Sequence, residues 1–188
     1  MPTLEQCVTI ATFLFGAGQD TTAKVLASTM RALAERPDIQ AQVRADRSLL
    51  PELVEETLRF EGPVKSSSRL VRKSTTLAGV ALPAGTHVSL LNGAMNRDPE
   101  KFDAPDEFRL GRPRARDHLA FGRGVHACLG ATLARNEVQV SLDRLLNRMG
   151  NIRLSEAQHG PPGARKFRME PGYVLRGVRR LHLQFTPL

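Results

Sequence analysis

The sequence contains no tryptophan and only one tyrosine among its 188 residues, although its formal net charge is +8. A nucleic-acid module that stacks bases needs aromatic side chains between its basic residues. Because this sequence has neither those aromatics nor a continuous basic block, we interpret most of its lysines and arginines as solvated surface, with some clustered for an anionic partner. A nucleic-acid-binding module is therefore disfavoured, and a salt-dependent gel shift would test it.

Cysteine is also scarce: Cys7 and Cys128 are too few for a disulfide framework. So low a cysteine count fits a reducing cytoplasm. The apolar run Cys7–Gly18 has 12 residues, which is too short to cross a bilayer. The residues before it include Glu5 and no lysine or arginine, unlike a signal peptide. We therefore predict a soluble cytoplasmic protein that makes no membrane contact.

Apolar residues recur at helical spacing through residues 1–36, which predicts one long helix. Between Cys7 and Ala17 this helix is apolar on nearly every face, so we expect the stretch to be buried. Two further helices are expected at 37–45 and 50–60, and Gly62 ends the second of them.

Short strands joined by turns are expected in 64–92, where Thr, Val and Leu recur near glycine and proline. A glycine-rich loop and a strongly helical stretch follow within 118–149. Alternating apolar residues near the C-terminus predict strands within 173–186. The sequence thus predicts a single domain that is mainly α, with small β-sheets.

Cys128 lies in the stretch Phe121-Gly-Arg-Gly-Val-His-Ala-Cys-Leu-Gly, directly before a predicted helix. The N-terminus of a helix carries partial positive charge, which lowers the pKa of a thiol and favours thiolate. Glycines let the backbone pass close to a flat group. The pattern suits a thiolate held under a macrocycle, and taken alone it fits a buried structural cysteine equally well. Zinc would have too few ligands in Cys128, His126 and His118, and no His–Asp pairing supports a catalytic cysteine.

A second motif, Ala17-Gly-Gln-Asp-Thr-Thr22, interrupts the apolar helix. Glycine in a helix interior costs about 0.5–1 kcal/mol relative to alanine, and a buried Asp20 is costly unless it is paired. Threonine can bond back to the carbonyl four residues earlier and open the local ladder. Alone, the motif fits a bend with a solvated polar face as well as it fits a functional site.

In their order along the chain, these motifs resemble those of the cytochromes P450, over most of this chain but only the last half of such a protein. Phe121-Gly-x-Gly-x-His-x-Cys-x-Gly resembles the family's haem-binding signature, which is long and specific. The resemblance implies that Cys128 is the axial thiolate ligand of heme b (iron protoporphyrin IX) and that His126 lies near a propionate. It also places Phe121, Gly122 and Gly130 in the cofactor site.

The Ala-Gly-x-Asp-Thr stretch resembles the oxygen-activating helix of the same family. The resemblance implies that Gly18 leaves room for dioxygen, that Thr21 hydrogen-bonds it, and that Asp20 helps to relay protons through water.

Glu56 and Arg59 stand three residues apart on one helical face. Taken alone they form an ordinary pair, but they resemble the family's buried Glu-x-x-Arg motif, which is structural rather than catalytic. The family commonly completes this pair with Arg or His before the cysteine loop. Glu107 stands at that place here, which leaves Arg109 or Arg112 as the substitute.

By resemblance, Arg69 is a candidate propionate clamp, because arginine makes bidentate contacts with carboxylates. A solvated strand arginine is almost as good an interpretation. His118 is a weaker candidate of the same kind, and Val64–Ser68 would border the substrate pocket.

The implied protein is a haem-thiolate monooxygenase that inserts one oxygen atom from O2 into a small hydrophobic organic substrate. Electrons would come from a ferredoxin-type partner, which basic residues such as Arg123 and Arg135 would dock. Because the preceding helices are absent, we expect a truncated gene product, a mis-called start or half of a split enzyme. The alternative is a non-catalytic remnant without a closed haem pocket. In either case an exposed apolar face of the long helix would favour aggregation or partner binding.

Overall fold

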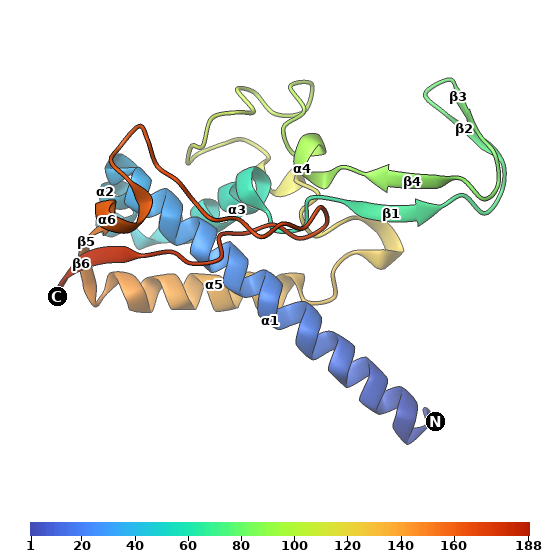
Figure 1. Ribbon diagram of the computed structural model, residues 1–188, viewed down its shortest axis with the longest axis horizontal. Coiled ribbons are helices and arrows are strands. Elements are labelled where there is room, and N and C mark those ends of the chain that lie inside the picture. Colours follow the sequence, from blue (N-terminus) through green and yellow to red (C-terminus); the bar gives the residue numbers. More distant parts are fainter.

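The computed structural model describes residues 1–188, and four helices form its body (Figure 1). Helix α1 (Leu4–Glu35) begins at a capping box in which Thr3 and Gln6 bond each other's backbone N–H groups. Pro37 opens α2 (Pro37–Ala45) at a position where proline's missing N–H costs nothing. Helix α3 (Leu50–Glu61) and helix α5 (Ala131–Leu146) pack against α1.

The strands form three separate two-stranded antiparallel sheets. The first pairs β1 with β4, the second pairs β2 with β3 at the tip of the same hairpin, and the third pairs β5 with β6. Their bounds are β1 Ser67–Leu70, β2 Thr75–Leu77, β3 Val80–Leu82, β4 His87–Leu90, β5 Met149–Leu154 and β6 Leu183–Pro187. Short helices α4 (Asn92–Met95) and α6 (Glu156–His159), with three 3-10 turns, complete the secondary structure. A mainly α fold with small sheets is confirmed.

Two details of the sheets differ from the sequence prediction. Strand β5 was not expected, and residues 173–182 contribute only the isolated bridges Val64–Leu175 and Met169–Val178 instead of strands. Gln40 accounts for the position of β5, because its side-chain amide donates to Ile152 O (2.8 Å) and accepts from Ile152 N–H (3.0 Å). This buried pairing from α2 holds the strand against the helical body.

The hydrophobic core lies between the C-terminal half of α1 and helices α2, α3 and α5. Its fully buried members include Leu33, Val43, Leu53, Leu142 and Leu146. None of these comes from the first 24 residues of the chain. The core therefore leaves the N-terminal half of α1 without packing partners.

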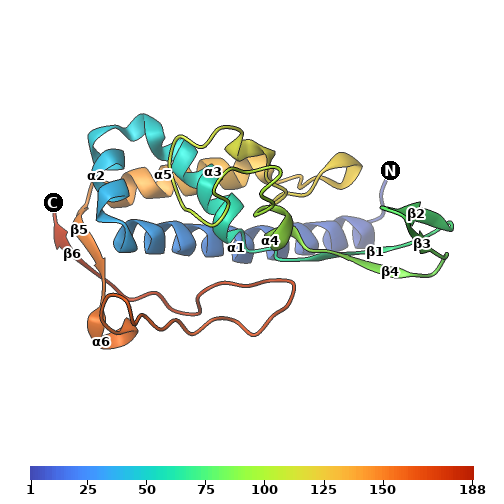
Figure 2. The same cartoon turned by 90° about the horizontal axis from the view of Figure 1, so that it is seen from above.

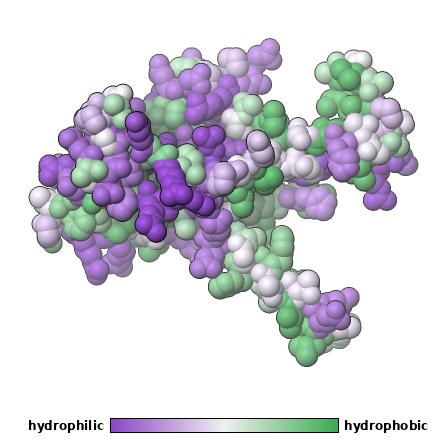
Figure 3. All heavy atoms as spheres, viewed as in Figure 1, coloured by the Kyte–Doolittle hydropathy of each residue, from purple (hydrophilic) through white to green (hydrophobic).

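The stretch Cys7–Ala17 is exposed, so the prediction that it is buried is wrong for this chain. Phe13 and Phe15 expose 70% and 72% of their surfaces, and Val8 and Ile10 each expose 56%. The physical reason is visible in Figures 1 and 2: this half of α1 projects beyond the body, and no other segment covers it. Figure 3 shows the resulting apolar surface on the projecting helix. No helix has the combination of length and apolar composition that crossing a bilayer requires.

Candidate functional site

The cysteine loop closes on itself just before α5. The N–H of Cys128 donates to Phe121 O at 2.8 Å, and Ala131, the first residue of α5, donates to Cys128 O at 3.3 Å. Gly122 and Gly124 have φ angles of +69° and +82°, which side chains with a Cβ rarely adopt. These two glycines are therefore needed for the turn itself. The predicted position of the cysteine before a helix agrees with the structure.

The thiol of Cys128 is free and exposed at the end of this loop. Val125 and Leu129 beside it are 98% and 86% exposed, so apolar surface surrounds the sulfur without a partner in this chain. A Cβ built on Gly130 would lie 3.9 Å from Sγ, an ordinary contact. Nothing in the chain therefore blocks a flat group from reaching the sulfur.

The second motif lies on the exposed half of α1. The helix stays α-helical throughout, although Thr21 Oγ1 donates to Ala17 O at 2.8 Å, the back-bond that its sequence suggests. Asp20 pairs with Lys24 one turn later. A Cβ at Gly16 or Gly18 would meet no atom within 4 Å. Open space therefore lies beside both glycines in this chain.

The three candidate propionate ligands differ in what they already bind. Arg69, on β1, is exposed and donates to Ser68 O at 2.9 Å without forming an ion pair. His126 is exposed in the cysteine loop. His118 is buried: its Nε2 lies 3.0 Å from Glu55 Oε2, and its Nδ1 accepts the N–H of Ala120 at 3.2 Å. Arg69 and His126 are thus available to an anion, whereas both ring nitrogens of His118 are engaged inside the protein.

The elements that carry these residues project toward the same end of the molecule. Figures 1 and 2 show the N-terminal half of α1, the loop before α5 and the β1–β4 hairpin extending beyond the helical body on one side. Thiol, guanidinium and imidazole donors, together with uncovered apolar side chains, suit a planar apolar group that bears a metal and carboxylates. The residues present therefore fit a haem. No group of three or more His, Cys, Asp or Glu side chains comes together in a way that could hold a metal ion by itself.

The predicted pair of Glu56 and Arg59 is buried and bidentate. Arg59 Nε and Nη2 each lie 2.8 Å from a Glu56 oxygen, and the two side chains are 0–1% exposed. The guanidinium also donates to three backbone carbonyls, of Asn96 (3.0 Å), Pro105 (2.8 Å) and Glu107 (2.9 Å). One arginine on α3 thus fixes the path of the loop that leads toward the cysteine.

Arg112 completes this network. Its Nε lies 3.1 and 3.0 Å from the two oxygens of Glu56, while its Nη atoms bond the carbonyls of Asp103, Ala104 and Glu107. Of the two arginines considered from the sequence, Arg112 supplies the side chain. Arg109 supplies its backbone N–H to Glu56 (3.1 Å), and its side chain pairs with the exposed Asp103.

A second buried carboxylate, Glu55, was missed from the sequence. It accepts from Arg135 on α5 (2.5 and 3.1 Å) and from His118 (3.0 Å). Burial alone would raise the pKa of Glu55, but these hydrogen bonds and charges outweigh it and lower the pKa to about 2. The Arg135 guanidinium also lies 4.5 Å from the centre of the Phe121 ring. Glu55 therefore ties α3 to both ends of the cysteine loop.

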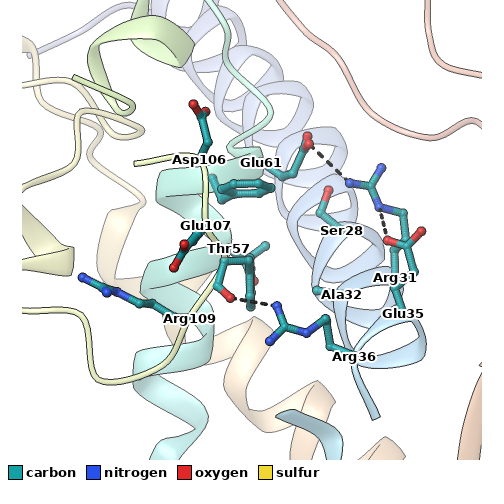
Figure 4. Close-up of a pocket in the computed structure, with 12 residues that line it drawn as sticks. Ser28, Arg31, Ala32, Glu35, Arg36, Thr57, Glu61, Asp106, Glu107 and Arg109 are labelled. Carbon is teal, nitrogen blue, oxygen red and sulfur yellow. Dashed lines mark hydrogen bonds and ion pairs between the residues drawn. The ribbon is translucent and has the colours of Figure 1, made fainter. Parts of the chain in front are cut away.

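A cavity of about 510 Å³ lies elsewhere, between α1, α3 and residues 106–109 (Figure 4). Charged groups line it, and several are already paired, as Arg31 is with Glu61 at 3.3 Å. Arg109, one of the two arginines considered for the Glu56 network, lines this cavity, but Cys128, Asp20 and Thr21 do not. The cavity separates α1 from the loop that Arg59 fixes and does not contribute to the cysteine site.

Comparisons with known proteins agree with this geometry. The family model for "Cytochrome P450" matches residues 2–150. The chain is 50% identical to "Cytochrome P450 144" of Mycobacterium tuberculosis over 143 residues, 76% of this chain and 33% of that protein. It is 38% identical to "Cytochrome P450 monooxygenase PikC" of Streptomyces venezuelae over 97% of this chain and 42% of that one.

Among solved structures, the substrate-free form of cytochrome P450 CYP150A6 from Mycobacterium marinum superposes with a TM-score of 0.98 at 54% identity. The superposition covers 100% of this chain and 46% of that chain, so this chain spans less than half the length of such relatives. The fold and the cysteine loop define the haem-thiolate class. The chain belongs to the cytochrome P450 family.

Proposed function

We propose that this chain is the haem-binding, C-terminal part of a cytochrome P450 monooxygenase, in which Cys128 would be the thiolate ligand of heme b. The observation that carries the proposal is the free thiol of Cys128, exposed at the end of a loop that Gly122 and Gly124 close and that precedes α5. A thiolate ligand such as Cys128 would donate more electron density to a bound haem than a neutral ligand does.

When bound, the haem would supply dioxygen binding and its reductive activation. The chain's own residues then have separate tasks. Cys128 would provide the ligand, and the free donors of Arg69 and His126 would pair with the propionates. His118 takes no direct part in this arrangement, because Glu55 and Ala120 occupy its ring nitrogens. Through these two hydrogen bonds, His118 connects the start of the cysteine loop to α3.

On α1, Gly18 leaves space beside the helix, and the Thr21 hydroxyl stands next to it. Because Thr21 donates its hydrogen to Ala17 O, its lone pairs remain free to accept a hydrogen bond. Asp20 carries the acidic group that exchanges protons with water. Replacing Thr21 with alanine should divert electrons from product, so intact coupling in that variant contradicts the proton-relay role.

The substrate would be a small hydrophobic organic molecule, bordered by Val64–Ser68 after α3. The electron donor would be a ferredoxin-type protein whose acidic surface meets the base of the cysteine loop. Arg123 suits this docking better than Arg135, because Arg135 is already committed to Glu55 whereas Arg123 is exposed and forms no ion pair.

The second candidate function is a non-catalytic remnant, which is favoured by the uncovered half of α1 and the open surroundings of Cys128. A haem titration separates the two. The chain is titrated alone, and again with the N-terminal half of the Mycobacterium marinum relative supplied in trans. Stoichiometric binding that depends on Cys128 in the second arm supports the enzyme. Absence of binding in both arms supports the remnant.

A further inference from the structure

Lys24 is a buried lysine that lies between two carboxylates. Its side chain is 6% exposed, and its ammonium contacts Asp20, one turn earlier on α1, and Glu170 Oε2 at 3.1 Å. Buried lysines are rare unless paired, and here the two partners come from distant parts of the sequence. Glu170 belongs to the C-terminal segment, which lies along α1 in Figure 1.

The C-terminal segment is shaped around this lysine. A Cβ at Gly177 would lie 2.8 Å from Lys24 Cγ and 3.0 Å from Cδ, so only glycine leaves room for the lysine stem. Glu170 N–H donates to Gly177 O at 3.0 Å, and the bridge between Met169 and Val178 continues the pairing. The hairpin of residues 169–178 therefore places the Glu170 carboxylate on Lys24.

Asp20 and Glu170 compete for one cation. Burial disfavours the ammonium, but the hydrogen bonds and charges of these two acids outweigh it and raise the pKa of Lys24, so it remains charged. Asp20 and Glu170 are the two ion-pair partners of the Lys24 ammonium. Asp20 is the more exposed partner, with 53% of its side chain accessible against 35% for Glu170.

We propose that Lys24 and Glu170 are positioning residues for Asp20: the hairpin takes part of the lysine's charge and thereby sets how firmly Asp20 is held as an anion. Only the link to catalysis rests on the proposed function, in which Asp20 is the proton-relay acid. Glu170 draws the Lys24 ammonium partly away from Asp20 and so weakens the Asp20–Lys24 pair. A movement of the hairpin away from α1 would tighten the Asp20–Lys24 pair and reduce proton relay.

The test is a carboxyl NMR titration of the full chain with ¹³C-labelled aspartate, in which Asp20→Asn identifies the Asp20 signal. Lys24→Met removes the shared cation and should raise the pKa of Asp20 by about 0.5–1 unit, the effect of one partly screened opposite charge. Glu170→Gln leaves Lys24 to Asp20 alone and should lower that pKa. Glu156→Gln, an exposed acid of the same C-terminal region, should leave it unchanged.

The test depends on the pKa of Asp20 shifting in opposite directions in Lys24→Met and Glu170→Gln. A clamp with a structural role alone would loosen in both variants and move the Asp20 titration in one direction, and this result, or no movement in either variant, overturns the proposal. Amide exchange at the hydrogen bond from Glu170 to Gly177 reports whether the hairpin stays in place. If Lys24→Met opens the hairpin, the direction of the Asp20 pKa shift in Glu170→Gln tests the proposal, because glutamine keeps the size of the glutamate side chain. No haem is needed, so failure of the proposed function leaves this result intact.

Discussion

The guanidinium of Arg112 lies against both carboxylate oxygens of Glu56, at 3.1 and 3.0 Å, on the side that Arg59 leaves open. One buried anion thus organises two arginines, which together bond the carbonyls of five loop residues: Asn96, Asp103, Ala104, Pro105 and Glu107. The loop before the cysteine has little regular secondary structure. Its path depends on this network.

Disrupting the network around Glu56 should therefore destabilise the loop. Glu56→Gln leaves two buried guanidinium groups without their anion, and we expect a loss of about 3–5 kcal/mol in the free energy of unfolding. Arg112→Lys should not preserve stability, because an ammonium cannot replace the planar fork. Denaturant titration measures both. Asp103→Asn, which breaks only the exposed pair with Arg109, is the matched control and should unfold like the parent chain. Equal stability of Glu56→Gln and the control would contradict the account.

Glu55 predicts a specific pH dependence of stability. Its pKa falls from 4.5 to about 2 on folding, so the folded state binds fewer protons than the unfolded chain between those values. The stabilisation is complete above about pH 4.5 and is lost as the pH falls toward 2. Measured from pH 6 to 2, the parent's unfolding free energy should fall more steeply than that of Glu55→Gln. Parallel curves would show that Glu55 is not held as an anion.

The two glycines of α1 offer a matched pair for the site. Gly16→Ala and Gly18→Ala should each stabilise the helix by about 0.5–1 kcal/mol, because neither Cβ meets another atom in this chain. The two positions lie on nearly opposite faces of the helix. In the haem-loaded assembly, only Gly18→Ala should weaken carbon monoxide binding. Equal carbon monoxide affinities in the two variants would contradict the placement of Gly18 beside the bound gas.

The uncovered half of α1 should make the isolated chain associate. Phe13→Glu combined with Phe15→Glu should reduce self-association and hydrophobic-dye binding, measured by sedimentation and fluorescence, with little change in the stability of the core. The same double variant should fail to bind the N-terminal half of the Mycobacterium marinum relative. If the double variant still binds that N-terminal half, another surface of the chain must be the binding site.

Local spacing made several features predictable. The spacing of Glu56 and Arg59 places them on one face of a helix, whether that face is buried or exposed. The glycines around Cys128 indicate a tight turn before a helix. Contacts between distant segments were not predictable. Glu55 contacts His118 and Arg135, which lie 63 and 80 residues away in the sequence. In the sequence alone, Glu55 stands next to Glu56 and has the pattern of an ordinary surface acid on a charged helix.

Other failures have equally physical causes. The choice between Arg109 and Arg112 depends on which way an irregular loop turns its side chains, which no periodicity encodes. Strand β5 includes Gly150 and Asn151, residues typical of turns, and Asn151 takes a φ of +46° at the irregularity of its pairing. The apolar half of α1 has the composition of a buried helix, but burial also requires a partner surface, which this chain does not provide.

The central claim is that the Cys128 thiolate binds the haem iron, and the carbon monoxide spectrum of the reduced protein tests it most directly. The haem-loaded chain, completed with the N-terminal half of its Mycobacterium marinum relative, is compared with Cys128→His in the same assembly. We predict a long-wavelength, thiolate-type Soret band for the parent, and a shorter-wavelength band typical of imidazole ligation for Cys128→His. Identical bands in the two proteins would contradict the assignment.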